Sequence, residues 1–223
     1  PRIHGKGPAS PRPIAQSPHQ CVNAGEKLLS LSLALLAAAA MTVPTLAASH
    51  TVQRGDTMWK LAVQYQVGTS EIIDANPQVA NPNLIYPGDV LTIPETDASV
   101  RACEQEVVRL VNAERAKHGL AALTEDWELS RVARYKSQDM HDNRYFAHNS
   151  PTYGTPFQMI RAFGLSYRAA GENIAMGYAA PAAVVAGWMN SEGHRANILS
   201  SAYTKIGVGY VADGHYWTQQ FIG

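Results

Sequence analysis

The stretch Trp188-Met189-Asn190-Ser191-Glu192-Gly193-His194-Arg195-Ala196-Asn197-Ile198-Leu199 gathers acidic, imidazole and amide side chains in one short segment. Two earlier segments carry matching groups, Phe146-Ala147-His148-Asn149-Ser150-Pro151 and Gly171-Glu172-Asn173-Ile174-Ala175. Neutral imidazole and carboxylate groups suit zinc, and they also suit a proton-sharing network in a cleft. We therefore expect the fold to bring these three segments to one crevice, whose chemical groups are His148, Glu172, Glu192 and His194.

The ordered combination of these motifs, closed by Ile206-Gly207-Val208-Gly209-Tyr210, resembles the CAP superfamily of cysteine-rich secretory proteins, antigen 5 and plant pathogenesis-related proteins. It is most similar to the short bacterial, YkwD-type (SCP-like) members, and the resemblance spans about residues 103–223. The resemblance implies an α-β-α sandwich with a central cavity of two histidines and two glutamates. His148, Glu172 and His194 match those positions. Glu192 departs from them, because it follows Trp188 by four residues where other members have three.

The chemistry of this cavity stays open between several alternatives. His148, His194 and Glu172 would hold a divalent cation such as zinc and leave one coordination position for water, as a metal-dependent hydrolase requires. The same groups would equally form a structural hydrogen-bond network, or line a cavity for a lipid or small molecule, as suggested for some CAP relatives. The sequence has no H-E-x-x-H helix, G-x-S-x-G elbow or Cys/His pair of suitable spacing. No catalytic residue is predicted, and the balance favours a protein that is not an enzyme.

Hydrophobic periodicity predicts the elements of this domain, residues 102–223. One helix contains Val107–Ala113 and ends at His118-Gly119, and a second runs from Leu129 into His141. Shorter helices are expected near Pro156–Phe163 and Pro181–Asn190. Two strands, Lys205–Val211 and His215–Ile222, flank an Ala212-Asp213-Gly214 turn. Ser150, Ser191, Asn173 and Asn197 are interpreted as capping or turn residues.

Residues 50–94 form a separate unit of β-α-α-β type. A strand at Thr51–Gln53 leads through a turn to Asp56, which is predicted to cap a helix with an apolar face, and a second helix begins near Thr69. A loop rich in asparagine and proline precedes the strand Val90–Ile93. The patterns V-x-x-G-D-T-x-W and I-x-x-G-x-x-L-x-I-P resemble the LysM domain along its whole length. The fold class of the chain is therefore α+β.

The LysM resemblance implies binding of an N-acetylglucosamine polymer, either peptidoglycan or a chitin-like glycan. Backbone amides and short polar groups would bond the sugar substituents, while apolar side chains cover the ring faces. A structural interpretation competes at several positions, because Gly55 and Asp56 also form turns, and Leu84 and Ile85 also suit a small core. His50 has no predicted role. The groove would be lined by Gly55, Asp56, Thr57, Met58, Asn83, Leu84, Ile85 and Tyr86.

The segments around these two domains have distinct compositions. Residues 1–21 are rich in proline and are predicted either to be disordered or to lie upstream of the true translation start near Val22. Residues 22–49 read as a secretory signal peptide, with cleavage near Ala47–Ser49, and an uncleaved membrane anchor is the alternative. Removal of the signal would leave no further stable membrane span. Residues 95–101 are expected to be a short polar linker.

The net charge of the chain after residue 49 argues against nucleic-acid binding. Residues 1–49 hold four of the 18 basic and one of the 18 acidic side chains, so the remainder has 14 basic and 17 acidic groups, a net charge of −3. Such a chain lacks the basic footprint of a nucleic-acid-binding protein. The expected function is that of a secreted, cell-wall-associated protein anchored to glycan, with envelope or spore-coat proteins as possible partners. The alternative is a metal-dependent cell-wall hydrolase or peptidase.

Overall fold

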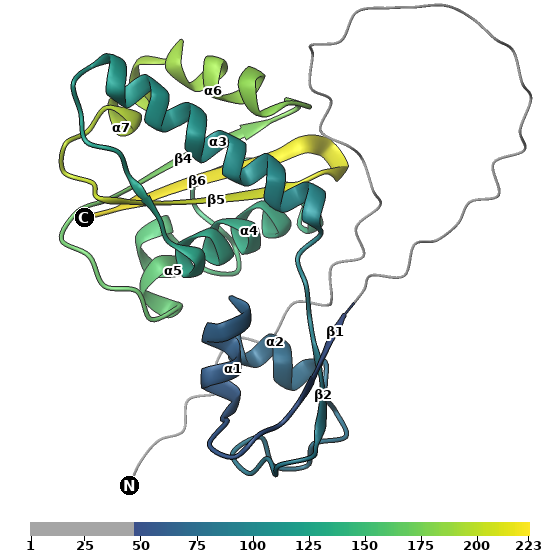
Figure 1. The fold of residues 1–223 in the computed structure, drawn as a ribbon. Coiled ribbons are helices and arrows are strands. Elements are labelled where there is room, and N and C mark those ends of the chain that lie inside the picture. The colour runs from purple at the N-terminus through teal and green to yellow at the C-terminus, as the bar shows by residue number, and fades with distance from the viewer. Residues whose placement is uncertain (1–46) are drawn as a thin grey trace, which may run out of the picture.

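The computed structural model describes residues 47–223, which form a small N-terminal module and a larger C-terminal domain (Figure 1). The predictions for residues 1–21, and for nearly all of the signal peptide at 22–49, lie outside the described residues. Across residues 47–223, no helix is long and apolar enough to cross a membrane.

The small module has the predicted β-α-α-β order. Strand β1 (Ala48–Thr51) pairs antiparallel with β2 (Val90–Ile93), and helices α1 (Met58–Tyr65) and α2 (Thr69–Asp74) lie between them in the chain. Strand β1 begins three residues before the expected Thr51–Gln53 strand, inside the segment assigned to the signal peptide. Ala48 already pairs with Ile93. A mature chain that keeps Ala48 therefore keeps the whole two-stranded sheet.

The turn between β1 and α1 differs from the prediction in one residue. Thr57, not Asp56, caps α1, because its hydroxyl accepts a hydrogen bond from the Lys60 amide at 3.1 Å. The Asp56 carboxylate instead accepts from the Gln53 amide at 2.8 Å and contacts the His50 ring at 2.8 Å. The other His50 nitrogen lies 2.9 Å from the Tyr65 hydroxyl. His50, for which no role was predicted, thus ties β1 to the turn and to α1.

A buried asparagine joins the second helix of the module to its last strand. The Asn76 amide group donates to the carbonyls of Ile72 and Thr92, both at 2.7 Å, and its oxygen accepts from the Thr92 amide at 2.8 Å. Leu61, Ile72, Leu91 and Ile93 complete a core that is fully buried at these positions.

The large domain is a three-layer α-β-α sandwich, as predicted (Figure 1). Its sheet has the strand order β3-β5-β6-β4, with β3 parallel to β5 and the other pairs antiparallel. Helices α3, α6 and α7 cover one face, and α4 and α5 cover the other. The elements are α3 (Ala98–Lys117), β3 (Thr124–Glu125), α4 (Trp127–Asp142), α5 (Pro156–Ala162), β4 (Ala170–Met176), α6 (Pro181–Met189), α7 (Glu192–Ile198), β5 (Lys205–Val211), the 3₁₀ turn η1 (Asp213–His215) and β6 (Tyr216–Ile222).

The linker is shorter than the predicted residues 95–101. Helix α3 begins at Ala98, because the Asp97 carboxylate accepts hydrogen bonds from the amides of Ser99 at 2.7 Å and Val100 at 3.3 Å. The module and the domain are therefore joined by only a few extended residues, and the two bodies are close neighbours.

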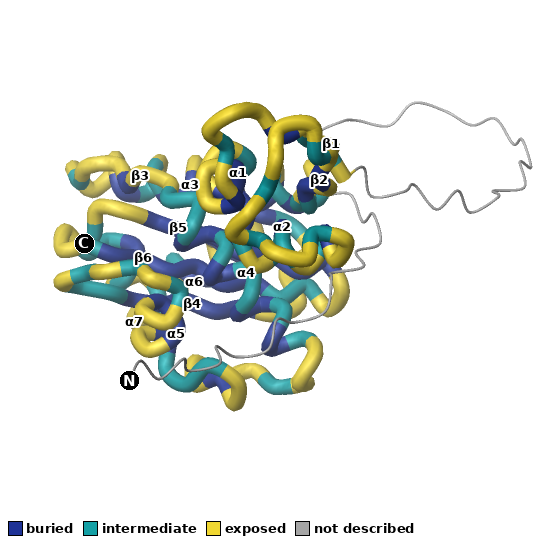
Figure 2. Tube along the Cα trace, turned by 90° about the horizontal axis from the view of Figure 1, so that it is seen from below, coloured by how far each residue is buried: buried dark blue, intermediate teal, exposed yellow. Residues whose placement is uncertain are grey.

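The central sheet is buried on both faces (Figure 2). Trp217 and Phe221 of β6 pack under α3 and α6. On the opposite face, Gly207 and Gly209 of β5 let the backbone of α4 approach closely, since a Cβ atom at either position would collide with α4 carbonyl groups. Cys103 of α3 is 2% exposed and belongs to the same core as Trp217 and Phe221.

Candidate functional site

The site is built on β4, an edge strand that hydrophobic patterning did not predict. Side chains alternate between the two faces of a strand. Glu172 therefore points to the α4 side, opposite Gln220 of β6, while Asn173 points to the α7 side, opposite Gln219. Both β4 side chains are buried. The strand thus presents one polar group to each of the two helical layers.

His148 reaches Glu172 from the loop between α4 and α5. Its Nδ1 lies 2.9 Å from Glu172 Oε1, and the second carboxylate oxygen accepts from Gln220 Nε2 at 3.0 Å. The Glu172 side chain is 2% exposed, whereas that of His148 is 51% exposed. A carboxylate only accepts hydrogen bonds, so His148 donates through Nδ1–H, and its Nε2 takes no part in this contact. The pair presents an oriented imidazole at the surface.

A buried lysine, which the sequence analysis did not single out, fixes the loop that carries His148. Lys136 of α4 has no exposed surface, and its ammonium group donates to the Tyr145 hydroxyl at 2.9 Å and the Ala147 carbonyl at 2.7 Å. Burial lowers the pKa of Lys136, against the opposite effect of the Glu172 and Asp139 carboxylates. Since Ala147 directly precedes His148, this hydrogen bond fixes the position of the backbone from which the imidazole extends.

Asp139, one turn further along α4, holds the other end of the same loop. Its carboxylate accepts from the hydroxyls of Ser150 and Thr152, each at 2.6 Å, from the Asn143 amide at 2.7 Å and from the Tyr145 hydroxyl. Ser150 in turn accepts from two backbone amides, so it is the turn-forming residue predicted from sequence. Lys136 and Asp139 lie a helical turn apart within α4, and no sequence motif at these positions predicts that they are buried or functional.

Helix α7 brings His194 to the other side of β4. The Asn173 side chain donates to the His194 carbonyl at 3.0 Å and to Gln219 at 2.9 Å, and Asn197 donates to the Glu172 carbonyl at 3.2 Å and to Asn173 at 2.9 Å. Both asparagines bond backbone groups as expected, but they stand in a strand and a helix, not in turns. Arg115 of α3 donates to the carbonyls of Ile198 and Ser200, which fixes the end of α7.

His148 lies close enough to His194 to act on it electrostatically. Burial lowers the pKa of His194 below its ordinary value, and the neighbouring His148 lowers it further. The structure therefore brings three of the four predicted cavity residues, His148, Glu172 and His194, to one end of β4.

Glu192 is placed away from this group. It is the first residue of α7, is exposed, and lines a separate hollow with Met189, Asn190, Arg195, Ala196 and Leu199. Residues two apart on a helix point about 200° apart, so Glu192 and His194 face different sides. A carboxylate is also stabilised at a helix N-terminus. The sequence-based assignment of Glu192 to the same cavity is not supported by this placement.

The predicted metal ligands His148, His194 and Glu172 do not form a ligand cage in the described part of the chain. Within residues 47–223, no three or more His, Cys, Asp or Glu side chains converge closely enough to hold a metal ion. Both Glu172 oxygens already have partners in His148 and Gln220. The side chains as arranged therefore fit a hydrogen-bonded pair and do not fit a three-ligand zinc centre.

The predicted glycan-binding residues lie on two neighbouring loops of the small module. Val52 and the turn at Gly88-Asp89 exchange backbone hydrogen bonds of 2.9 and 2.8 Å, which holds the two loops together. Leu84 and Tyr86 are 52% and 57% exposed, and Gly55, Thr57 and Asn83 are also exposed. Ile85 and Asp56 are partly buried, whereas Met58 is a core residue at 4% exposure. These loops lie at the end of the module that faces away from the large domain (Figure 1).

Comparison with known proteins defines the class. Residues 108–221 match the CAP model, described as the cysteine-rich secretory protein family, and residues 50–94 match the LysM domain. The chain belongs to the CAP family and carries a LysM domain ahead of the CAP domain.

Individual relatives are bacterial. The chain is 59% identical over 132 residues to the protein YkwD of Bacillus subtilis (strain 168), an alignment that covers 59% of this chain and 51% of YkwD. It is 42% identical over 52 residues to SpoIVD-associated factor A of the same organism, covering 23% of this chain and 13% of that protein. A crystal structure of an extracellular protein containing an SCP domain from Bacillus anthracis str. Ames matches with a TM-score of 0.53 and 38% identity, covering 61% of this chain and 47% of that one. This chain thus spans about half of the length of YkwD.

Proposed function

We propose that this protein is a secreted, cell-wall-associated protein that holds peptidoglycan through its LysM module and presents its CAP domain at the cell surface for binding. The observation that carries the proposal is the pair of joined loops at the outer end of the module. LysM domains bind N-acetylglucosamine polymers, and here the loops that would do so are free of contact with the CAP domain. Glycan can therefore approach them while the CAP domain stays accessible.

The location of the protein is supported by its relatives. The SCP-domain structure from Bacillus anthracis is described as extracellular, and SpoIVD-associated factor A is named for association with a sporulation protein. A wall or spore-coat setting accounts for the pairing of a glycan-binding module with a CAP domain. Envelope or coat proteins are then the partners that we propose for the CAP domain.

The CAP site favours binding over turnover in this proposal. An oriented imidazole beside a buried carboxylate can exchange hydrogen bonds with a polar ligand group. The frame of Lys136 and Asp139 behind it stabilises one loop conformation. Since the side chains do not fit a zinc centre, no metal-dependent reaction step is derived from them.

Co-sedimentation with purified peptidoglycan tests the proposal. Leu84→Ala combined with Tyr86→Ala removes two exposed side chains that form no side-chain hydrogen bond with any of residues 47–223, so folding should be retained. We expect roughly a tenfold weaker association, chiefly from the loss of Tyr86, because aromatic side chains carry a large share of the free energy at binding surfaces. The matched control is Phe157→Ala combined with Met176→Ala, which removes similarly exposed side chains of the CAP domain (45% and 47%).

Retention of binding by the Leu84/Tyr86 variant, or its loss in the control, would contradict glycan recognition by the LysM loops. The hydrolase alternative makes a separate prediction. A zinc-dependent release of soluble fragments from peptidoglycan that His194→Ala abolishes would replace the binding role of the CAP domain with a catalytic one.

A further inference from the structure

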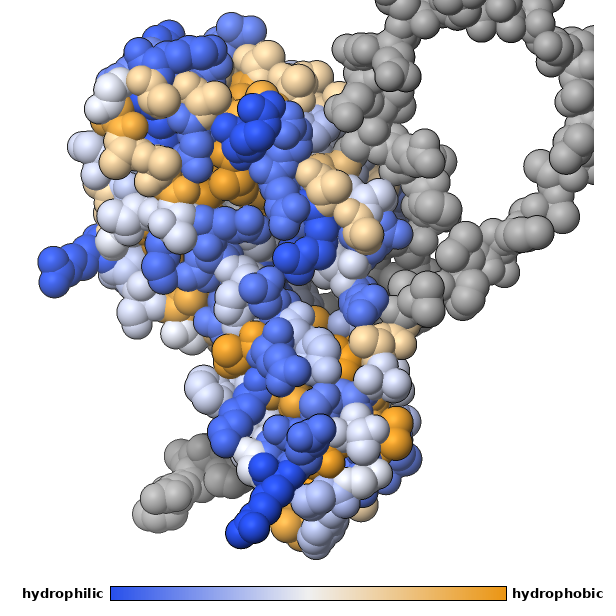
Figure 3. Space-filling view, viewed as in Figure 1, coloured by the Kyte–Doolittle hydropathy of each residue, from blue (hydrophilic) through white to orange (hydrophobic). Residues whose placement is uncertain are grey.

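A pocket of about 360 Å³ lies between the LysM module and the CAP domain, at the opposite end of the module from the glycan loops. Its walls come from α1 and the start of α2 on one side, and from α4, α5 and the loop before α5 on the other. A volume of this size falls in the range of small-molecule sites. Apolar surface is visible where the two bodies meet (Figure 3).

The back of the pocket is held by contacts that cross the domain boundary. Glu71 of the LysM module accepts from Arg131 at 2.7 Å and from the Tyr135 hydroxyl at 2.6 Å. The Arg131 guanidinium also lies over the Tyr135 and Phe163 rings, at 5.4 and 5.1 Å from their centres. These side chains are largely buried, at 16% exposure for Arg131 and 25% for Glu71. The pocket is therefore lined by Arg131 and Tyr135, whose positions are fixed by Glu71 behind them.

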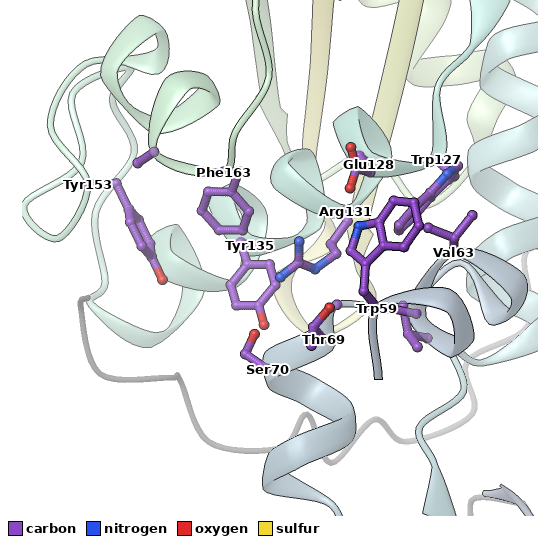
Figure 4. A pocket seen from close by; sticks show the side chains of 14 residues that line it. Trp59, Val63, Thr69, Ser70, Trp127, Glu128, Arg131, Tyr135, Tyr153 and Phe163 are labelled. Carbon is purple, nitrogen blue, oxygen red and sulfur yellow. The ribbon is translucent and has the colours of Figure 1, made fainter. Parts of the chain in front are cut away.

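Two indoles line one side of this pocket, one from each domain. Trp59 of α1 is 66% exposed, and Trp127 at the start of α4 is partly exposed. Trp188 and Trp217, by contrast, are core residues at 1% and 0% exposure. Figure 4 shows the indoles of Trp59 and Trp127 on one side, the aromatic rings of the CAP domain on the other, and the Arg131 guanidinium between them. Exposed aromatic side chains gathered at one concave place indicate a binding surface.

The charges of the pocket indicate what it would accept. Arg131 is already compensated by Glu71, and the arginine lowers the pKa of that carboxyl against the opposing effect of burial. The base therefore offers no unpaired positive charge to an anionic ligand. The other polar side chains of the lining are the hydroxyls of Thr69, Ser70 and Tyr153, the two indole N–H groups and the carboxylate of Glu128. Such a set suits an uncharged ligand with many hydroxyl or amide groups and an apolar ring face.

We propose that this interdomain pocket is a second glycan-binding site, which takes N-acetylated amino-sugar units against the indoles of Trp59 and Trp127. Sugar rings present C–H faces to aromatic side chains, while the surrounding hydroxyl and carboxylate groups bond their polar substituents. The inference rests on the proposed glycan-binding function, but it assigns the CAP domain a direct part in binding. A glycan held at both ends of the module would gain affinity by joint engagement.

The test uses the full chain and tetra-N-acetylchitotetraose as the probe. Because Trp188 and Trp217 are buried, acrylamide quenching of tryptophan fluorescence reports mainly on Trp59 and Trp127. Saturating probe should roughly halve the quenching constant, since stacking covers one face of each exposed indole. Trp127→Ala should weaken probe binding about five- to tenfold, the effect of losing one stacking partner. Phe157→Ala, an exposed aromatic outside the pocket, should bind as the wild type does.

The outcomes separate the two proposals. If Trp127→Ala binds the probe as tightly as the wild type while Leu84→Ala/Tyr86→Ala loses binding, the LysM loops bind glycan and the pocket does not. If the wild type binds no probe and shows no protection from acrylamide, both proposals fail. The quenching experiment on the wild type and the conservative Trp127→Phe variant keep the inference testable if Trp127→Ala does not fold. An acrylamide quenching constant that stays the same when a probe binds would also overturn the inference.

Discussion

The LysM loops and the CAP site support their exposed groups in different ways. In the LysM module, Leu84 and Tyr86 stand on turns that are held by backbone hydrogen bonds and by the side chains of Asn81 and Asp89, which accept from the amides of Asn83 and Tyr86. In the CAP domain, the exposed His148 is backed by buried Lys136 and Asp139. Buried polar groups are costly unless every one is paired. The LysM module therefore presents its surface without burying charged side chains behind it. The CAP domain buries Lys136 and Asp139 to fix the position of one loop.

The largest effect should follow from breaking the frame behind His148. Asp139→Ala leaves the hydroxyls of Ser150 and Thr152 without their acceptor and leaves Lys136 beside fewer compensating charges. We expect the free energy of unfolding of the CAP domain to fall by about 3 to 5 kcal/mol. Urea denaturation followed by the emission of the buried Trp188 and Trp217 measures it. The exposed neighbour Asp142→Ala is the control, and equal losses from both variants would refute a special role for Asp139.

A second test uses glycine residues, which the two domains require for different physical reasons. Gly55 and Gly88 of the LysM module have positive φ angles in open space, whereas Gly209 lies under the backbone of α4. Gly209→Ala should destabilise the CAP domain by about 2 kcal/mol, because α4 must move away from the sheet.

The control for this glycine is Gly193→Ala, on α7, where an added Cβ atom meets no neighbour within 4 Å. Alanine there should be neutral or stabilise by up to about 1 kcal/mol, as expected for a helical position. Thermal unfolding of both variants decides the matter, and a larger loss from Gly193→Ala would contradict the close approach of α4 to β5.

A smaller effect is expected in the LysM module. Thr57→Ala removes the hydroxyl that caps α1 and should cost about 1 kcal/mol, while Thr57→Ser should restore most of it. Hydrogen exchange of the α1 amides measures the loss locally. If α1 protection were unchanged in Thr57→Ala, the helix would depend on tertiary packing alone.

The smallest effect concerns a half-buried histidine of the CAP domain, His141. His141 contacts Asp142 at 2.7 Å and Asp213 at 3.1 Å, and its pKa is raised chiefly by the hydrogen bond to Asp142. A raised folded-state pKa gives stability that is complete below the unfolded value near 6.5 and is lost as pH rises through the folded value. His141→Gln should therefore cost about 0.5 kcal/mol or less at pH 6 and almost nothing at pH 8. If the loss in the free energy of unfolding grew with pH, the contacts of His141 with Asp142 and Asp213 would not stabilise the charged imidazole.

Much of the fold follows from local sequence, but the site's supporting strand does not. The helices around Val107 and Leu129 show clear apolar stripes, and Asp213-Gly214 marks the turn between β5 and β6. Strand β4 has no alternating pattern, because α7 and the His148 loop bury both of its faces. Its Gly171, Glu172 and Asn173 also disfavour strands in isolation.

The site itself was predicted in part. The resemblance to CAP proteins indicated His148, Glu172 and His194, which the structure brings to one end of β4. Glu192 could not be placed from spacing alone, because its direction depends on where α7 begins. Lys136 had no sequence signal, since a lysine in an amphipathic helix normally faces solvent. The interdomain pocket likewise depends on how two separate folds meet.

On this account, the chain recognises glycan at the LysM loops and at the adjoining interdomain pocket, and not at His148 and His194 of the CAP domain. Two-dimensional amide NMR of the isotope-labelled full chain, titrated with tetra-N-acetylchitotetraose, tests it most directly. The account predicts shifts at residues 55–57 and 83–86, together with the indole N–H signals of Trp59 and Trp127. Shifts concentrated at His148, Glu172 and His194, with the LysM loops unchanged, would contradict it.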